Sequence, residues 1–359
     1  MFRNSRHNFF STPKFLEIPS FGLDISDESI KYVELLPTDK GIQLGRYGEK
    51  KMPLGVMELG EIKDPTKLEE LLLALKNEYN MHSVRVSILE NQIYLFKLFL
   101  EKEGVSDIRQ SIELSLEEHI PIPAQEAIFD YEIVVEHDTL LEVQVAAVQQ
   151  SVIESYLSVF MSVGLAVHSF ELEAQAIARA INKKGDPETY MIVDFGERRT
   201  GIFIVTAGKV MFTSTIDLGG DVLDNMIEKN FKVSKQEAEK MKIQYGLQRN
   251  AANKEMFSIL LNSVSILKDE VSKHFVYWHT HEDEDGTRNP PIKKILLCGG
   301  DSNLVGLTEY LSVTMKTEVE MANVWVNILD TNQYVPSIDF KHALSFAAAL
   351  GLALGDFDL

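Results

Sequence analysis

Two aspartates in this chain follow apolar stretches at points where a strand is expected to turn. Asp24 lies in "FGLDISDESIKYVEL", and Asp194 has the same place in "MIVDFGERRTGIFIV". After each aspartate come a short polar turn and a second apolar strand, 30–35 or 202–205. Such a turn can present backbone N–H groups to phosphate oxygens while the carboxylate reaches a hydrated Mg²⁺ ion. Two such turns facing each other would hold a metal–triphosphate from both sides.

A glycine pair adds a third element to this pattern. Gly299 and Gly300 follow the apolar strand "KKILLC" and precede a helix expected at about 303–315. Glycine lets the backbone approach a flat or charged ligand closely, and a helix N-terminus favours phosphate. Each element alone is a weak indication, and both hairpins could serve the fold only. The order of the three elements along the chain is more specific.

The acid-bearing turns belong to two similar successions of elements. Residues 21–60 are predicted to form a strand meander, and "YMIVDF", "TGIFIVTAG" and "KVMFTSTIDLGG" form a second one. Between them, the order strand, helix, strand, strand, helix in 83–163 predicts a small α+β insert. Further helices are expected at about 66–79 (capped by Asp64), 220–230, 234–245 (capped by Ser234), 252–278 and 341–354. This repetition predicts a duplicated α/β architecture with a cleft between its copies.

Composition narrows the class of protein. A chain of 359 residues is too long for one compact core. Its net charge of −19 disfavours binding to nucleic acid or to anionic lipid. The single cysteine, Cys298, excludes an intramolecular disulfide and fits a reducing compartment, and its apolar strand favours a buried, inert thiol. The longest apolar run, "ALSFAAALGLALG", is shorter than the ~20 residues of a membrane span, and no signal peptide is evident. A cytoplasmic protein is expected.

Other site patterns have less support. His274, His279 and His281 lie near "EDED", but a polar loop bounded by prolines favours a solvated segment over a metal site. Neither GxxxxGK[ST] nor GxGxxG occurs, so the usual phosphate-loop and dinucleotide classes lack support.

The order of turn, second turn and glycine pair resembles the actin-like ATPase superfamily. Within it, the chain resembles the PilM family of type IV pilus assembly proteins, which are relatives of FtsA, over about residues 20–355. The segments that carry this resemblance are "LSLEEHIPIPAQEAIFDYEIV", "VQVAAVQQSVIESYLSVFMSVGLAVHSFELEAQAIARAI" and "STIDLGGDVLDNMIEKNFKVSKQEAEKMK". It implies an α/β protein of the actin-like ATPase fold, in which two duplicated ribonuclease-H-like halves flank a nucleotide cleft.

The resemblance also implies a division into subdomains. After a flexible N-terminal arm, the expected order is subdomain 1A, an FtsA/PilM-type subdomain 1C, the return to 1A, and then subdomains 2A and 2B. A C-terminal helix returns to 1A. The expected ranges are 1–20 for the arm, 21–94 and 169–189 for 1A, 95–168 for 1C, 190–230 and 291–340 for 2A, 231–290 for 2B and 341–359 for the last helix.

By the same resemblance the cleft binds ATP and Mg²⁺. Asp24 and Asp194 would be the metal-side acids, acting through water, and Glu173 would position the attacking water of a weak ATPase. Ala174 follows Glu173, where relatives commonly have proline. Glu239 and Lys242 would meet the ribose and adenine. The remaining expected nucleotide contacts are Ser26, Gly196, Thr200, Gly219, Gly220, Gly299 and Gly300.

The first turn departs from the family pattern. Ser26 stands where relatives usually have glycine, and Asp27 and Glu28 stand where they have small or hydroxyl residues. Two extra carboxylates beside a triphosphate weaken its binding unless a cation, or Arg198 and Arg199, offsets them. A nucleotide-free actin-fold scaffold is therefore the alternative.

The family also implies a partner. PilM-like proteins lie beneath the inner membrane and bind the N-terminal cytoplasmic tail of the membrane protein PilN, in a groove between subdomains 1A and 1C. Here that groove is expected within 83–170, with an extended peptide beside "FDYEIVV" held by main-chain pairing. The protein would link the pilus assembly platform and its motor to the cytosol.

Two other classes of protein have less support. An FtsA-like membrane anchor would need a C-terminal amphipathic helix, but the chain ends "LGLALGDFDL" without basic residues. A sugar or acetate kinase would need a base on the substrate side, and no sequence feature marks one.

Overall fold

The structure is a computed structural model that describes residues 20–39, 41–102, 107–249, 253–281, 288–328 and 334–357. The expected N-terminal arm lies outside the described residues except for Ser20, and so does the acidic segment 282–287.

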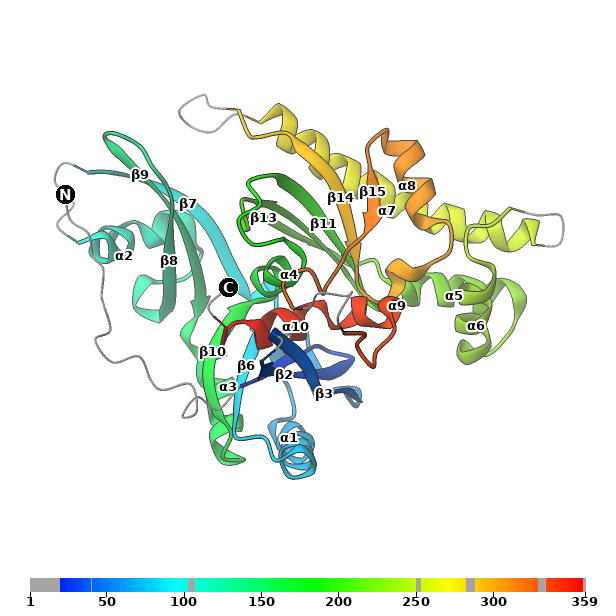
Figure 1. Cartoon of the computed structure of the whole chain (residues 1–359), viewed down its shortest axis with the longest axis horizontal. Coiled ribbons are helices and arrows are strands. Elements are labelled where there is room, and N and C mark those ends of the chain that lie inside the picture. The colour runs from blue at the N-terminus through cyan, green and yellow to red at the C-terminus, as the bar shows by residue number, and fades with distance from the viewer. Residues whose placement is uncertain are drawn as a thin grey trace.

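Two five-stranded sheets form the framework of the molecule (Figure 1). The first has the order β10-β6-β1-β2-β3 and the second has the order β13-β12-β11-β14-β15. In the first sheet, β1 pairs antiparallel with β2 and parallel with β6. In the second sheet, β11 pairs in the same way, antiparallel with β12 and parallel with β14. The strands of the first sheet are β1 (Phe21–Ile25), β2 (Ser29–Thr38), β3 (Gly41–Lys51), β6 (Ser83–Ile88) and β10 (Ala166–Leu172). Those of the second are β11 (Thr189–Phe195), β12 (Thr200–Thr206), β13 (Lys209–Ile216), β14 (Ile292–Cys298) and β15 (Val319–Met321). The two sheets thus repeat the same strand order and pairing, as the predicted duplication requires.

Four of the described α-helices, α1, α2, α6 and α9, begin where a side chain accepts a free N–H group of the first turn. Asp64 accepts the N–H of Lys67 at the start of the first helix, and Ser234 accepts that of Glu237 at the start of α6. The helices are α1 (Pro65–Tyr79), α2 (Ile108–His119), α3 (Gln150–Ser162), α4 (Glu173–Ile181), α5 (Gly220–Phe231), α6 (Lys235–Tyr245), α7 (Lys254–Thr280), α8 (Leu307–Met315), α9 (Phe340–Ala343) and α10 (Ala347–Leu354). Short 3-10 turns lie at Glu90–Gln92, Ala124–Glu126, Gly300–Asn303 and Leu344–Phe346. The helix predicted at 303–315 begins later, at Leu307, and the turn at Leu344–Phe346 divides the helix predicted at 341–354 into α9 and α10.

The insert is a separate three-stranded sheet, seen at the left of Figure 1. Its order is β7-β9-β8, and α2 covers one face through the buried residues Ile112 and Leu116. Its strands are β7 (Ile93–Glu101), β8 (Ala127–Glu136) and β9 (Leu140–Gln149), while the small hairpin of β4 (Met57–Glu58) and β5 (Glu61–Ile62) belongs to the first half. Tyr156 and Phe160 of α3 are buried in the core of the first sheet. We therefore place the end of the insert near Gln149 instead of at 168.

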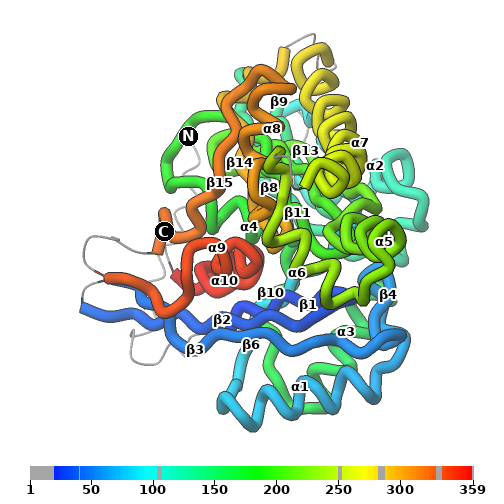
Figure 2. Tube along the Cα trace, turned by 90° about the vertical axis from the view of Figure 1, so that its right-hand side faces the viewer, coloured from blue at the N-terminus to red at the C-terminus, as the bar shows by residue number. Residues whose placement is uncertain are grey.

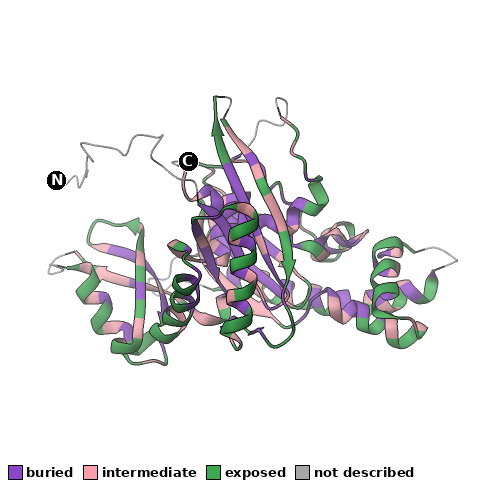
Figure 3. Cartoon of the chain, turned by 90° about the horizontal axis from the view of Figure 1, so that it is seen from below, coloured by how far each residue is buried: buried purple, intermediate pink, exposed green. Residues whose placement is uncertain are grey.

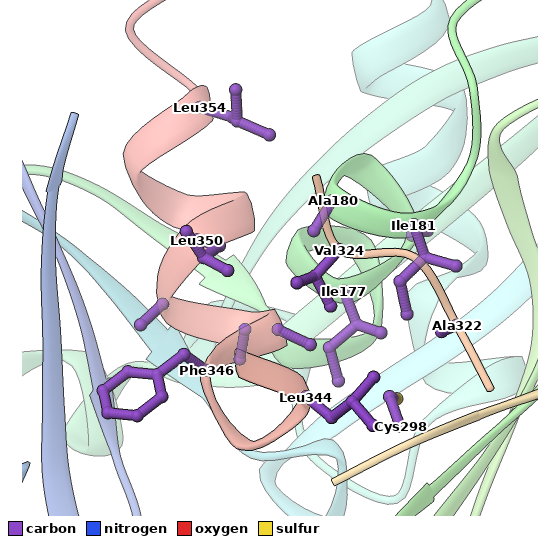
Figure 4. Packing of buried hydrophobic residues seen from close by; sticks show 14 of the residues in the cluster. Ile177, Ala180, Ile181, Cys298, Ala322, Val324, Leu344, Phe346, Leu350 and Leu354 are labelled. Atoms are coloured by element: carbon purple, nitrogen blue, oxygen red, sulfur yellow. The ribbon is translucent and has the colours of Figure 1, made fainter. Parts of the chain in front are cut away.

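One hydrophobic cluster joins the two halves. It contains Ile177 of α4, Leu350 of α10, and Cys298 and Val324 from the second half. Figure 4 shows α4 and α10 lying together, with Ile177 and Leu350 between them and Cys298 and Val324 beside α4. In Figure 2, α9 and α10 lie above β1 and β2 on the side of the second sheet. Buried residues accordingly concentrate at the centre of the molecule, as Figure 3 shows. The two halves share a core, so they are not independent domains.

Candidate functional site

A cavity lies where the turns after β1 and β11 face each other, and we refer to it as the cleft. Its volume of about 330 Å³ is in the range of small-molecule sites, roughly 300–1,000 Å³. An ion pair joins the two turns, since Arg198 Nε lies 3.1 Å from Glu28 Oε1. Nine of the twelve predicted site residues line the cleft: Asp24, Ser26, Glu173, Asp194, Gly196, Glu239, Lys242, Gly299 and Gly300.

Ser26 fills the first turn with its own side chain. Its Oγ accepts hydrogen bonds from the N–H groups of Glu28, at 3.3 Å, and Ser29, at 3.2 Å, and donates to the Ser29 carbonyl. Two N–H groups that a phosphate-binding turn would offer to its ligand are therefore already engaged.

The two extra acids of the first turn point in different directions. Asp27 is buried, and its carboxylate accepts the N–H groups of Leu59, at 2.9 Å, and Gly60, at 3.2 Å. Glu28 lines the cleft and pairs with Arg198. Burial raises the pKa of Glu28 above its usual range. Of the two extra acids, only Glu28 would therefore repel a triphosphate in the cleft, and the positive charge of Arg198 offsets it.

The second turn has no such side chain because glycine stands at position 196. The N–H of Gly196 donates to the Arg199 carbonyl at 3.0 Å, and its carbonyl accepts the N–H of Gly220 at the start of α5. Within the described part of the chain, no hydrogen bond takes the N–H of Glu197 or Arg198. These N–H groups remain available to an anion.

Gly299 brings the end of β14 against the second turn. Its φ is +87°, and a Cβ there would lie 2.5 Å from Asp194 Oδ1 and from the Phe195 carbonyl oxygen. Only glycine fits at this position. A Cβ on Gly300 would lie 3.8 Å from Ser345 Cβ, which is an ordinary van der Waals contact, so this position does not require glycine.

Three predicted contact residues do not reach the cleft. Thr200 is fully buried, and its hydroxyl donates to the Leu218 carbonyl at 2.6 Å. Gly219 and Gly220 form the start of α5 behind the second turn, where a Cβ on Gly219 would lie 2.3 Å from the Glu197 carbonyl oxygen. These three residues shape the turn without facing a ligand.

The two aspartates at the strand ends lie in an environment of mixed charge. Asp24 is buried, accepts a hydrogen bond from the Ser87 hydroxyl at 2.8 Å, and lies opposite Lys31 in the β1–β2 pair. Burial, together with the charge of Asp24, raises the pKa of Asp194 to about 6, and Lys31 opposes this rise. Cys298 Sγ lies 3.7 Å from Asp194 Oδ1, and burial raises the pKa of this thiol, which agrees with the inert role expected.

Glu173 shares a hydrogen bond with a second acid that the sequence did not mark. Glu173 is the first residue of α4, and its carboxyl group is hydrogen-bonded to Glu90. Glu90 Oε1 also accepts the N–H of Ala174 at 2.7 Å. Burial raises the pKa of Glu90 to about 7, and burial and Glu90 together raise that of Glu173. At neutral pH this pair therefore retains a proton.

Lys242 lines the cleft but is engaged by protein groups. Its Nζ lies 2.6 Å from Asp301 Oδ1 and 2.9 Å from Asp224 Oδ2, and it donates to the Gly220 carbonyl at 3.3 Å. Burial lowers the pKa of Lys242, but Asp301 and Asp224 more than reverse this effect. The lysine thus links α5, α6 and the turn after β14. Glu239 lies one turn earlier on α6 and also lines the cleft.

Acids outnumber bases in the cleft wall. The acids are Asp24, Glu28, Glu49, Glu90, Glu173, Asp194, Glu197, Asp224, Glu239 and Asp301, and the bases are Lys31, Arg198, Arg199, Lys235 and Lys242. A bare polyphosphate would be repelled, so an anionic ligand needs an accompanying cation. In the described part of the chain, no three His, Cys, Asp or Glu side chains converge closely enough to hold a metal ion directly.

A second cavity, which we refer to as the groove, separates the insert from the first sheet. Its volume is about 550 Å³, and its apolar walls include Ile88, Leu95 and Phe170. Five consecutive residues of β8, 128–132, line it. Ile128, Asp130 and Glu132 lie on the same face of the insert sheet as Gln144 and Ala146 of β9, so this face forms a wall of the groove. In the described residues β8 pairs only with β9, so β8 is an edge strand beside the groove and its outer backbone groups are not paired within the sheet.

Both sites belong to a chain that resembles known proteins over most of its length. The family model described as "Type IV pilus assembly protein PilM" matches residues 22–357. This chain belongs to the PilM family. Among solved structures, "PilM-PilN type IV pilus biogenesis complex" is similar at a TM-score of 0.78 and 20% identity, covering 95% of this chain and 99% of that one.

Two further solved structures place the PilM-family chain among actin-like proteins. The ethanolamine utilization protein EutJ from Carboxydothermus hydrogenoformans has a TM-score of 0.55 at 16% identity, covering 94% of this chain and 90% of that one. MreB5 of Spiroplasma citri bound to ADP has a TM-score of 0.53 at 15% identity, covering 86% and 93%. The expected actin-like fold is confirmed. Within the described ranges, no helix has the length and apolar character needed to cross a bilayer.

In this PilM-family chain, helix α4 contributes to both cavities. Glu173 and Ile177 line the cleft, while Gln175 and Arg179 line the groove. The segment from β6 to β7 does the same, with Glu90 at the cleft and Ile88 and Ile93 at the groove. The two candidate sites therefore share a wall.

Proposed function

We propose that this actin-like type IV pilus assembly protein binds Mg²⁺·ATP in the cleft. The observation that supports this most directly is the pair of acid-bearing turns that face each other across a cavity of nucleotide-binding size. Asp24 and Asp194 would hold the metal through water, the open second turn would receive phosphate oxygens, and Gly299 and Gly300 would leave room for the adenosine. The similar MreB5 structures are bound to ADP and to AMPPNP.

One group in the cleft is suited to the hydrolysis of a bound nucleotide. Glu173 lies at the N-terminus of α4, and its hydrogen bond to Glu90 fixes the direction of its carboxyl group. A carboxyl group in this position can orient a water molecule. The shared proton weakens Glu173 as a base, so we expect turnover to be slow.

We propose further that the groove binds the N-terminal cytoplasmic tail of a PilN-like inner-membrane protein. The solved structure with a TM-score of 0.78 is a complex of PilM with PilN. The edge of β8 offers main-chain pairing, and the apolar walls offer pockets for alternate side chains of an extended peptide. Asp130 and Glu132 on β8 favour a tail that carries positive charge, its terminal ammonium group included.

These two proposals together describe an adaptor. The protein would lie at the cytoplasmic face of the inner membrane, held there by its partner, and would join the assembly platform to motor components. Because α4 borders both cavities, bound nucleotide would influence the shape of the groove.

A nucleotide-free scaffold is the second candidate, and one observation favours it. The Ser26 hydroxyl engages two N–H groups of the first turn, so that turn contributes less to phosphate binding than an open one would. The scaffold would keep the groove and its partner without a ligand in the cleft.

Calorimetric titration of Mg²⁺·ATP into the wild-type chain and into Asp194→Ala separates these candidates. We expect saturable binding that the substitution removes. Absence of binding to a folded wild-type chain would exclude the nucleotide proposal and leave the scaffold. The partner proposal is tested separately, by titrating a synthetic peptide of the tail into the same protein.

A further inference from the structure

The groove contains a buried amide whose donor lacks a partner. Gln144 lies on β9, the central strand of the insert sheet, and lines the groove. Only 5% of the residue is exposed, and its Nε2 is inaccessible to solvent. Within the described part of the chain, this atom makes no hydrogen bond. Buried donors in native proteins nearly always have a partner, so an unused one indicates a ligand.

Two acids on the same face of the sheet as Gln144 are paired with lysines. Across the sheet it lies opposite Lys97 on β7 and Glu132 on β8. Glu132 pairs with Lys209 at 2.9 Å, and Glu142, two residues earlier on the same face, pairs with Lys97 at 2.9 Å. The protein therefore leaves the Gln144 amide for a group that enters the groove.

The surroundings select the chemistry of that group. Four carboxylates lie on or beside the groove here: Asp130, Glu132, Glu142 and Glu171. Glu132, Glu142 and Glu171 are paired with Lys209, Lys97 and Arg179, so the charge of Asp130 is the one that would repel an anion here, whereas a neutral carbonyl oxygen would not be repelled. Ala146, the next residue on the same face, is small and leaves space for such a group beside the amide.

We propose that Gln144 is a specificity-determining residue of the groove, where its side-chain N–H donates to a neutral carbonyl oxygen of the bound peptide. This inference rests on the proposed peptide-binding function. The carbonyl is either the side-chain amide of an Asn or Gln or a main-chain carbonyl. A site that offers a buried donor discriminates strongly against ligands without the matching acceptor, because the donor is then left unpaired.

The test uses the full chain and a synthetic peptide of the N-terminal cytoplasmic residues of the PilN-like protein from the same organism. Gln144→Met has a similar size but no donor, and Gln144→Glu keeps the shape but adds a charge. Gln110→Met, on the exposed face of α2, is the matched control. Affinities are measured by calorimetry and thermal stability by scanning calorimetry.

We expect Gln144→Met to weaken peptide binding about tenfold and Gln144→Glu to weaken it more, with no change for Gln110→Met. We also expect the melting temperature of free Gln144→Met to be equal to or slightly above that of the wild type, because the substitution removes an unpaired donor. A residue needed only for folding would instead lower the melting temperature.

Peptide variants identify the acceptor. Each Asn or Gln of the tail is replaced by Leu, and main-chain amides are replaced by esters, whose carbonyls accept hydrogen bonds less well. One peptide variant should bind the wild-type protein about tenfold more weakly than the natural peptide does. Its affinity should not fall further when the protein carries Gln144→Met. Coupling to a Leu replacement would identify a side-chain amide, and coupling to an ester would identify a main-chain carbonyl.

Two results would overturn the inference. The first is that Gln144→Met binds the tail peptide as tightly as the wild type does. The second is that Gln144→Met weakens the binding of every peptide variant by the same factor. If the wild type binds no tail peptide, the proposed groove function fails and the role of Gln144 fails with it. Binding without any coupling to Gln144 removes only this inference.

Discussion

In the first turn of the cleft a serine hydroxyl holds two backbone N–H groups, whereas in the second turn Gly196 leaves the corresponding groups without a side-chain acceptor. Both turns occupy the same place in sheets of the same strand order. The acids Glu90 and Glu173, however, belong to the first half only. Under the proposed nucleotide function, the second half would supply the wall that receives phosphate, and the first half would supply the wall that orients water.

The strongest test of this asymmetry compares the two aspartates. Asp194→Ala should reduce Mg²⁺·ATP affinity at least 100-fold, because it removes the proposed metal-side acid next to the open turn. Asp24→Ala should reduce it about tenfold, since the first turn contributes less; these sizes follow from about 1.4 kcal/mol for each factor of ten. Calorimetric titration at fixed Mg²⁺ measures both. Equal losses would mean that the halves contribute alike.

The second test changes the first turn of the cleft so that it resembles the second turn. Ser26→Gly removes the hydroxyl that occupies the first turn and frees the N–H groups of Glu28 and Ser29. We expect Mg²⁺·ATP affinity to rise about tenfold, as two N–H donors become available at about 1 kcal/mol or less each. Ser29→Ala is the control in the same turn, because it leaves the Ser26 hydroxyl in place. A fall in affinity in Ser26→Gly would show that the hydroxyl itself contacts the ligand.

The third test concerns the acid pair of the first half. The pKa of Glu90 in the folded protein is raised to about 7 from the usual 4.5, so folding is opposed increasingly as pH rises through this window. Glu90→Gln can keep the hydrogen bonds to Ala174 and Glu173 without this effect. We expect it to increase the free energy of unfolding at pH 8 by about 1–3 kcal/mol and to have little effect at pH 5. Chemical denaturation at both values measures the difference, and an equal gain at pH 5 would contradict the assignment.

The smallest effect is expected for the ion pair between the turns. Arg198 is partly exposed, so its pair with Glu28 contributes about 0–1 kcal/mol. Arg198→Ala should lower Mg²⁺·ATP affinity about threefold at low salt and less at 0.5 M salt, where the pair is screened. A loss that is unaffected by salt would indicate direct contact between Arg198 and the ligand.

Much of this arrangement follows from local sequence signals. The equivalent positions of Asp24 and Asp194 predicted the two halves, and the glycine pair after "LLC" predicted the third wall of the cleft. These elements are readable because strand periodicity and turn chemistry act over a few residues.

Other features depend on contacts between distant segments. Asp27 appeared to face the ligand, but its orientation is set by Leu59 and Gly60, which the sequence does not mark as neighbours. Thr200 appeared to be a ligand contact, but its hydroxyl is bound to Leu218. Glu90 escaped notice because nothing in "SILENQ" distinguishes it from a surface glutamate.

The close contact of α10 with β1 and α4 has a consequence for folding during synthesis. A Cβ on Gly22 would lie 2.0 Å from the Ala349 carbonyl oxygen, and one on Gly351 would lie 1.7 Å from that of Ala176. The first strand of the chain is therefore covered by one of its last helices. Contacts between such distant segments form late, so the N-terminal half leaves the ribosome before its own covering layer has been made. Until α10 has emerged, the face of β1 that carries Gly22 lacks its covering helix.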